Sequence, residues 1–104
     1  MKKLLSISLF CAFLFAGSGS LWAGDAKAGK ELATTCMACH GEKGISEMSE
    51  IPNLAGQQED YLVIAIKGYK DGTRNNDVMS ASVESVTDKD VENLAAYFSS
   101  LECK

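Results

Sequence analysis

Three stretches of the chain repeat small and apolar residues at the spacing of an amphipathic helix. Within each stretch these positions follow at i, i+3, i+4 and i+7, so they share one helix face. In chain order the positions are Gly29, Leu32, Ala33 and Cys36; then Leu62, Ala65, Ile66 and Tyr69; then Val91, Leu94, Ala95, Phe98 and Leu101. The pattern predicts an all-α fold.

Residues at the ends of the second and third stretches support these helices. Glu59 and Asp60 fall in the first turn of the second, where acidic side chains suit the helix dipole, and Gly72 stands just past its end. Thr87 is the expected N-cap of the third helix, with Asp90 in the capping-box position.

The segments between these helices show no strand pattern. Residues 41–57 and 71–86 are polar, contain several glycines and asparagines, and are expected to be irregular. Loops this long are unusual in a small domain. We therefore expect them to enclose something other than protein.

The first 23 residues follow a different pattern. Lys2 and Lys3 precede an almost unbroken apolar run over residues 4–16, and small residues come next. These are the parts of a secretory signal peptide, and the run is short for a membrane span. We expect cleavage after Ala23, which leaves a mature domain of residues 24–104; a retained membrane anchor is the alternative.

Length and composition fit one small globular domain. The 104 residues are 46% hydrophobic and 23% charged, which excludes a collagen-like or wholly disordered chain. The formal net charge is −4, and loss of residues 1–23 would make it −6 because two lysines and no acid are removed. This balance argues against a nucleic-acid partner. An exported domain this short commonly needs disulfides, a metal or a cofactor.

The cysteines indicate which stabilising group to expect. Cys11 lies in the expected signal peptide, so three remain, and an odd number excludes a fully paired disulfide framework. Residues 36–40 read Cys-Met-Ala-Cys-His, the C-x-x-C-H motif of haem c attachment. The thiols of Cys36 and Cys39 can add to the two vinyl groups of one porphyrin, and His40 would supply the proximal iron ligand.

Two other interpretations of the cysteine pair have less support. A thioredoxin-like pair needs a βαβ context, and no strand-like run precedes Cys36. A zinc site needs four ligands, but only Cys103 could add a distant thiolate and His40 is the only histidine. We therefore expect one covalently attached haem c.

The second axial position of the iron decides what such a protein does. No second histidine exists, which leaves methionine or lysine as its ligand. Met37 is inside the motif and Met48 follows His40 by eight residues, whereas Met79 follows it by 39, within a polar segment. We expect Met79 to be the distal ligand; the alternative is that it fills a gap in the core.

Taken together, these residues resemble a class I c-type cytochrome, the small bacterial kind with a single haem, over essentially all of the mature chain. Beyond the motif, the resemblance includes Gly29 and Leu32, residues 52–57, the run 69–79 and the last helix. It implies the cytochrome c fold, with short helices and loops wrapped around one haem.

The resemblance also implies roles for single residues. The carbonyl of Pro52 would accept a hydrogen bond from the proximal histidine and so orient His40. Arg74 would contact a haem propionate; the alternative is that it is a solvated charge in the loop. Gly29 on the first helix would receive Tyr97 from the last.

The function implied is electron transfer in the periplasm, as part of a respiratory chain, without enzymatic activity or membrane insertion. The iron would cycle between ferric and ferrous states and pass single electrons between larger redox proteins, which an acidic chain would meet through their basic patches. The alternative is a haem-based sensor or catalytic haem protein with an open sixth position, in which Met79 is unbound. Cys103 departs from the simplest family pattern, and both an intermolecular disulfide and an inert exposed thiol remain open for it.

Overall fold

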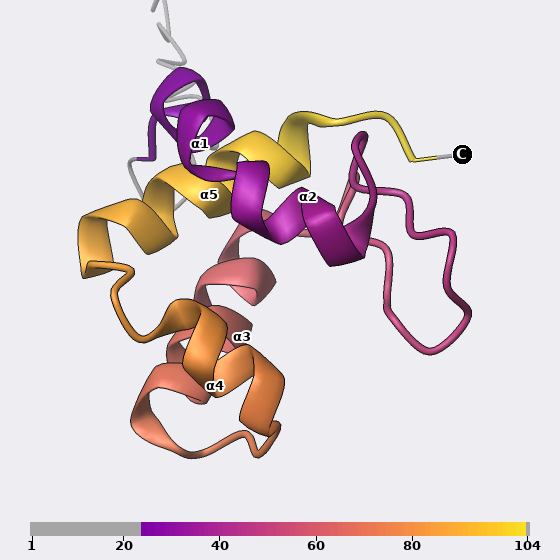
Figure 1. Cartoon of the computed structure of the whole chain (residues 1–104). Helices are drawn as coiled ribbons and strands as arrows, with labels where there is room; N and C mark the ends of the chain where they lie inside the picture. The colour runs from indigo at the N-terminus through magenta and orange to yellow at the C-terminus, as the bar shows by residue number, and fades with distance from the viewer. Residues whose placement is uncertain (1–23, 104) are drawn as a thin grey trace, which may run out of the picture.

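The computed structural model describes residues 24–103, and all regular structure among them is helical. The helices are α1 (Ala26–Leu32), α2 (Thr34–His40), α3 (Glu59–Asp71), α4 (Asp77–Val83) and α5 (Asp88–Ser100) (Figure 1). The expected all-α fold is confirmed. The expected signal peptide, residues 1–23, lies outside the described residues. Within residues 24–103 no helix is long and apolar enough to cross a membrane.

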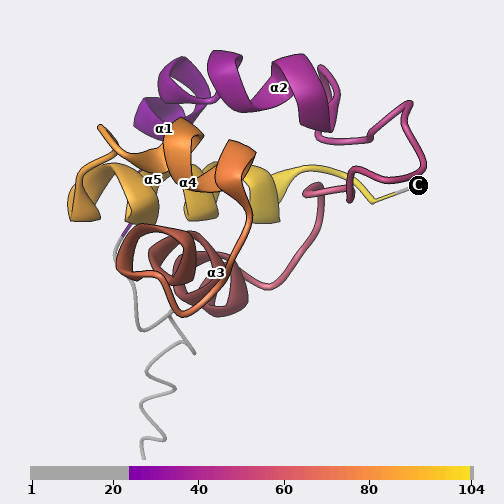
Figure 2. The ribbon, with the colours of Figure 1, turned by 60° about the horizontal axis from the view of Figure 1, so that its bottom comes forward.

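Helix α5 is the centre of the fold. α1 packs against one side of it and α3 against the other (Figure 2). The core cluster consists of Ala33, Leu62, Val63, Val91, Leu94, Ala95, Tyr97 and Phe98. Most of these residues belong to α3 and α5. The apolar face expected for the third helix forms the core, whereas of the face expected for the second helix only Leu62 is in the cluster, and the fully buried Val63 lies outside the expected positions.

Helices α1 and α5 approach closely because a glycine lies between them. A methyl group at Gly29 would lie 1.9 Å from the carbonyl oxygen of Asn93 and 2.8 Å from Cβ of Tyr97. The expected pairing of Gly29 with Tyr97 is therefore present. Asn93 itself was not expected to matter: its buried side-chain oxygen accepts a hydrogen bond from the backbone N–H of Asp25 at 2.9 Å and so holds the start of α1 on α5.

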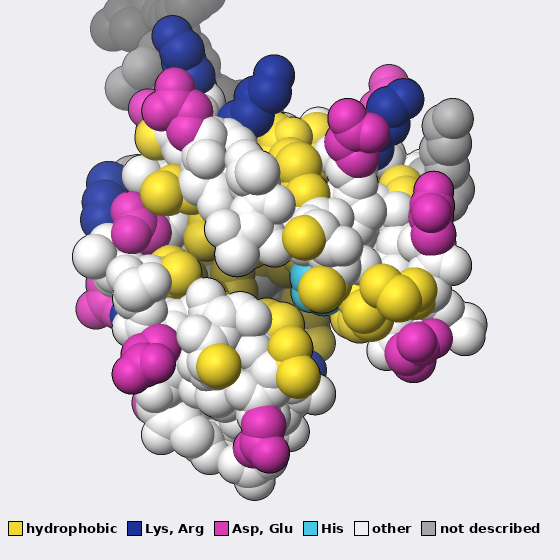
Figure 3. Space-filling view, in the orientation of Figure 1, with side chains coloured by type: hydrophobic (Ala, Val, Ile, Leu, Met, Phe, Trp, Pro, Cys, Tyr) yellow, Lys and Arg dark blue, Asp and Glu magenta, His cyan; other side chains and the backbone are white. Residues whose placement is uncertain are grey.

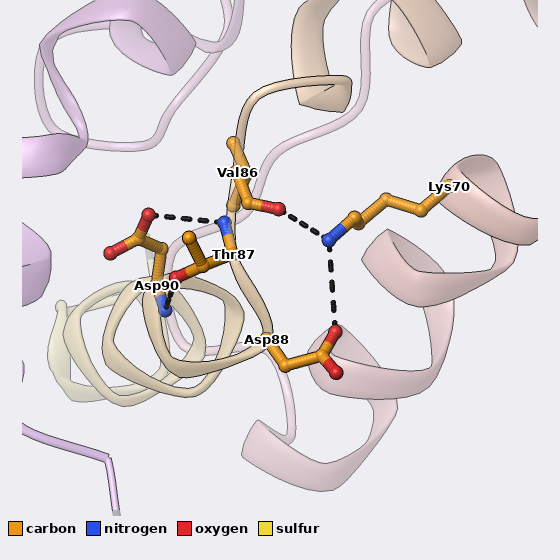
Figure 4. Close-up of polar contacts among 5 residues, drawn as sticks. All are labelled: Lys70, Val86, Thr87, Asp88 and Asp90. Atoms are coloured by element: carbon orange, nitrogen blue, oxygen red, sulfur yellow. Dashed lines mark hydrogen bonds and ion pairs between the residues drawn. The ribbon is translucent and has the colours of Figure 1, made fainter.

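The start of α5 is fixed by a capping box and by contacts with α3 (Figure 4). The Thr87 hydroxyl accepts a hydrogen bond from the backbone N–H of Asp90 at 3.1 Å, and the Asp90 carboxylate accepts one from the Thr87 N–H at 3.1 Å. Lys70 of α3 donates to the carbonyl of Val86 and lies 3.6 Å from the carboxylate of Asp88. The expected cap at Thr87 is confirmed.

The prediction of one continuous helix over the first stretch is wrong. It divides at Ala33 into α1 and α2, and Leu32 on the predicted apolar face is 39% exposed. Ala33 has ψ near zero and its N–H bonds to the carbonyl of Lys30, three residues back, which tightens the last turn of α1. The buried Ala33 thus serves as the corner from which α2 leaves in a new direction.

The expectation that residues 71–86 are wholly irregular is also wrong, because α4 lies within them. The Asn76 side chain caps this helix by accepting a hydrogen bond from the backbone N–H of Met79 at 3.0 Å, and Asp77 stands in its first turn. A helix of 7 residues is too short to show a clear apolar period. Its signal was the cap, an asparagine followed by an acid.

Candidate functional site

Helix α2 brings the three motif residues together on its last turns. Cys36 is half-buried, Cys39 is exposed, and both are free thiols. Burial raises the pKa of the Cys36 thiol, so it is neutral at pH 7. His40 ends the helix and is 7% exposed. Cys39 is therefore exposed on the surface of α2, Cys36 is partly covered by the core, and the imidazole is turned inward.

The chain reverses direction directly after His40. Gly41 has a φ of +90°, in the region that glycine adopts without strain. A methyl group there would lie 1.8 Å from the carbonyl oxygen of Ile45. A glycine is therefore required after the motif for the following loop to fold back under α2.

That loop supplies the hydrogen-bond partner of the histidine. Nδ1 of His40 lies 2.7 Å from the carbonyl oxygen of Pro52, which can only accept, so Nδ1 carries the proton and donates. Nε2 is then the nitrogen with a free lone pair, and it makes no hydrogen bond within residues 24–103. A fixed ring with a free Nε2 is the form in which a histidine binds a metal.

Internal hydrogen bonds hold this loop in place. The carbonyl of Gly44 accepts from the backbone N–H groups of Leu54 and Ala55, at 2.8 and 3.0 Å. The Asn53 side chain accepts from the N–H of Ser46 at 2.7 Å. The position of Pro52, and with it the orientation of His40, is therefore set by the loop backbone. The role of Asn53 in fixing this loop was not predicted from the sequence.

Met79 lies on a different helix from the motif, in the first turn of α4, and is half-buried. α4 packs against α3, whereas α2 packs against α1. In Figure 3 a hollow separates the upper part of the molecule from the lower part that α3 and α4 form. Apolar surface borders the hollow, and the histidine, coloured cyan and the only one in the chain, lies at its edge.

Two further residues singled out by sequence have defined surroundings. The guanidinium of Arg74 lies over the ring of Tyr69, 4.6 Å from its centroid, and forms no ion pair among the described residues. Cys103 is a free, exposed thiol next to Gly56, where an added methyl group would lie 2.7 Å from its Cβ.

These side chains fit a covalently attached haem. Cys36 and Cys39 are unpaired, His40 has a free Nε2, and α4 carries the half-buried thioether of Met79. A zinc site finds no such support, because no group of three or more His, Cys, Asp or Glu side chains that could hold a metal ion occurs within the described residues.

Comparison with known proteins decides the family. The model of the family described as "Cytochrome c" matches residues 26–102, nearly all of the described chain. The chain belongs to the cytochrome c family. The class I resemblance seen in its sequence is thereby confirmed.

Related proteins agree with this assignment. The cytochrome is 43% identical over 83 residues to cytochrome c-554(548) of Halomonas halodenitrificans, covering 77% of this chain and 100% of that protein. It is 41% identical over 100 residues to cytochrome c4 of Pseudomonas aeruginosa, covering 96% of this chain and 49% of that protein.

A solved structure shows the same fold. Reduced recombinant cytochrome c4 from Pseudomonas stutzeri matches with a TM-score of 0.74 and 38% identity, over 77% of this chain and 47% of that chain. The cytochrome c fold is thus confirmed. The cytochrome spans the whole length of its Halomonas relative and about half the length of these cytochromes c4.

Proposed function

We propose that this cytochrome carries single electrons in the periplasm through one haem c, attached to Cys36 and Cys39 and ligated by His40 and Met79. Membership of the cytochrome c family supports electron transfer as its role. The hydrogen bond of 2.7 Å between His40 and Pro52 carries the ligand assignment, because it leaves Nε2 free and its ring fixed. When bound, the haem supplies an iron that changes between ferric and ferrous states.

In this role the protein makes and breaks no substrate bond. Its residues instead hold the haem and adjust its reduction potential. Cys36 and Cys39 keep the cofactor on a small chain outside the cytoplasm. The Pro52 carbonyl fixes the His40 ring and makes it more basic. The thioether of Met79 favours the ferrous state and raises the potential relative to a second nitrogen ligand.

Arg74 completes the proposed cofactor contacts. Its guanidinium is stacked on Tyr69 and leaves its N–H groups without a carboxylate partner among the described residues. A propionate is a carboxylate that such a group binds well. We assign Arg74 to one haem propionate.

The proposed partners are larger redox proteins with basic patches. The acidic net charge supports this choice, since opposite charges speed encounter. The periplasmic location rests on the expected signal peptide. In this proposal the cytochrome relays electrons and catalyses no reaction of its own.

The visible spectrum of the periplasmically matured protein tests the proposal. We expect haem c bands in the wild type and, in the ferric form, the weak long-wavelength band of methionine sulfur on iron. Met79→Ala should lose that band and lower the midpoint potential, whereas the matched change Met48→Ala should keep both.

Each other result has a definite meaning. Haem bands that lose the sulfur band only in Met48→Ala would move the distal ligand to Met48. Haem bands with no sulfur band in the wild type would leave the sixth position open and favour a sensor or catalytic haem protein. Absence of haem, with an intact maturation system, would overturn the proposal.

A further inference from the structure

The carbonyl group that orients the proximal histidine belongs to an exposed residue with no donor of its own. Proline has no backbone N–H, so Pro52 cannot anchor itself by donating a hydrogen bond. Its carbonyl oxygen lies 2.7 Å from Nδ1 of His40, although Pro52 itself is exposed. The direction of this carbonyl must therefore be set by the residues on either side of the proline.

Asn53 is placed to set that direction. The carbonyl of Pro52 and the backbone nitrogen of Asn53 belong to one planar peptide unit, so a restraint on Asn53 also restrains the carbonyl. The side chain of Asn53 accepts a hydrogen bond from the backbone N–H of Ser46 at 2.7 Å. Because the donor is a backbone N–H, the atom that faces it is the amide oxygen.

This hydrogen bond crosses the loop, whereas its neighbours are local. It joins positions seven apart in the sequence. The hydroxyl of Ser46 bonds to the backbone of Met48, and the N–H of Ile51 donates to the carbonyl of Met48. The local bonds shape one limb of the loop, and the side chain of Asn53 ties that limb to the other directly beside Pro52.

The ends of the loop are held independently of this side chain. The carbonyl of Gly44 accepts two backbone hydrogen bonds from the far limb, and the carbonyl of Phe98 in α5 accepts one. The donors are the N–H groups of Leu54, Ala55 and Gly56. Loss of the Asn53 side chain leaves these bonds in place, so we expect it to loosen the segment around Pro52 without unfolding the loop.

From this arrangement we propose that Asn53 is a positioning residue for the proximal ligand, whose side chain holds the Pro52 carbonyl against Nδ1 of His40 and thereby lowers the reduction potential. The inference rests on the proposed function, since it takes His40 as an iron ligand. A well-aligned hydrogen bond from Nδ1 makes Nε2 a better electron donor, which stabilises ferric iron more than ferrous iron. Its effect on the potential is opposite to that of the Met79 thioether.

The midpoint potential of the periplasmically matured, haem-loaded protein tests this role. Asn53→Ala should raise it, because the hydrogen bond to His40 becomes less well aligned. At a fixed solution potential we expect the ratio of ferrous to ferric protein to rise by roughly threefold, less than the effect of losing a direct partner of the ligand, because Asn53 acts through the Pro52 carbonyl.

The matched control is Ser46→Ala in the same loop. It removes the hydrogen bonds of the hydroxyl with Met48 and keeps the N–H that Asn53 accepts. We expect it to leave the ratio of ferrous to ferric protein unchanged. Equal shifts in the two variants would mean that any loosening of the loop moves the potential and would overturn the role of Asn53. No shift in either variant would overturn it too.

Hydrogen exchange of the Nδ1 proton of His40, followed by NMR in the ferrous protein, reports on the bond itself. Asn53→Ala should speed this exchange by roughly tenfold, and Ser46→Ala should not. Asn53→Asp keeps an acceptor oxygen and should restore slow exchange. Exchange is the readout for this variant because its added charge lowers the potential by itself. Fast exchange in Asn53→Asp would overturn the proposal.

Haem content separates this inference from the proposed function. Haem c and sulfur bands in the wild type keep the proposed function standing whatever the variants show, whereas their absence overturns both. Failure of Asn53→Ala alone to attach haem, with Asn53→Asp and Ser46→Ala loaded, would support the role of the acceptor in holding His40. Failure of Asn53→Asp as well would overturn it.

Discussion

The two halves of this cytochrome are held together in different ways. In the half formed by α1, α3 and α5, protein packs on protein: Phe98 is 1% exposed, and α1 approaches α5 so closely that only glycine fits at position 29. In the half formed by α2, the following loop and α4, both helices have 7 residues and each packs mainly on one neighbour. Met79 there is only half-buried.

The helices of the first half are stabilised by packing on one another, whereas we expect those of the second half to need the cofactor for their stability. Short helices with few tertiary contacts are marginal in water, and their stability must come from what they pack against. We expect the packing of α1, α3 and α5 to set the free energy of global unfolding, and the stability of α2 and α4 to depend on the proposed haem.

The largest effect is expected at the centre of the packed half. Phe98→Ala should lower the free energy of unfolding by about 3–5 kcal/mol, because it removes a large buried ring and leaves a cavity. Ile64→Ala, on the exposed face of α3, should change it by less than about 0.5 kcal/mol. Denaturant unfolding of the haem-loaded protein measures both. Similar losses from the two variants would mean that the core does not lie where α3 and α5 meet.

A smaller effect is expected where α1 meets α5. Gly29→Ala should cost about 2 kcal/mol, although alanine favours a helix, because its methyl group meets the backbone carbonyl of Asn93. Gly72→Ala has no neighbour within 4 Å and should cost only about 1 kcal/mol, the strain of its φ of +85°. Thermal unfolding of the two variants compares steric clash with backbone strain. A milder loss for Gly29→Ala would show that the helices can move apart freely.

The two helix caps compare the halves most directly. Thr87→Ala removes the cap of α5 and should lower global stability by about 1 kcal/mol. Asn76→Ala removes the cap of α4 and should affect global unfolding less, because α4 packs mainly on α3. It should instead make the methionine–sulfur band disappear at a lower temperature than global unfolding. Simultaneous loss of the band and of the far-ultraviolet helix signal in Asn76→Ala would show that α4 unfolds with the core.

The same division explains which parts of the structure were predictable from sequence. Helices α3 and α5 were predicted because each has 13 residues, long enough to show the apolar period. The predicted face of α5 is buried, but on α3 the fully buried Val63 lies outside the predicted stripe. The caps at Thr87 and Gly72 were predictable because their residue types are specific to those positions. The break at Ala33 and the existence of α4 were missed because helices of 7 residues are too short to display a period.

For the site, the sequence indicated the residues and their spacing but not the hydrogen bonds that hold them in position. The motif and the family resemblance singled out Cys36, Cys39, His40, Pro52 and Met79. The hydrogen bonds of Asn53, which fix the loop, and of Asn76, which begins α4, arise from backbone geometry that spacing alone does not display. The stacking of Arg74 on Tyr69 was likewise not expected.

The smallest effect lies at the boundary between the halves, where α3 ends. Hydrogen bonds from the N–H and hydroxyl of Thr73 lower the pKa of the Asp71 carboxyl. A pKa lower in the folded chain contributes stability above the ordinary value, about 4, and this is lost as pH falls through the folded-state value. Asp71→Asn should therefore lower the melting temperature slightly at pH 7 and not at a pH where both states are protonated. Thr73→Ala, which removes the hydroxyl and keeps the N–H, should show part of the same pH dependence. If melting of the haem-loaded protein shows no such dependence, this turn opens before the core and belongs with α4; if it does, the packed half extends to the end of α3.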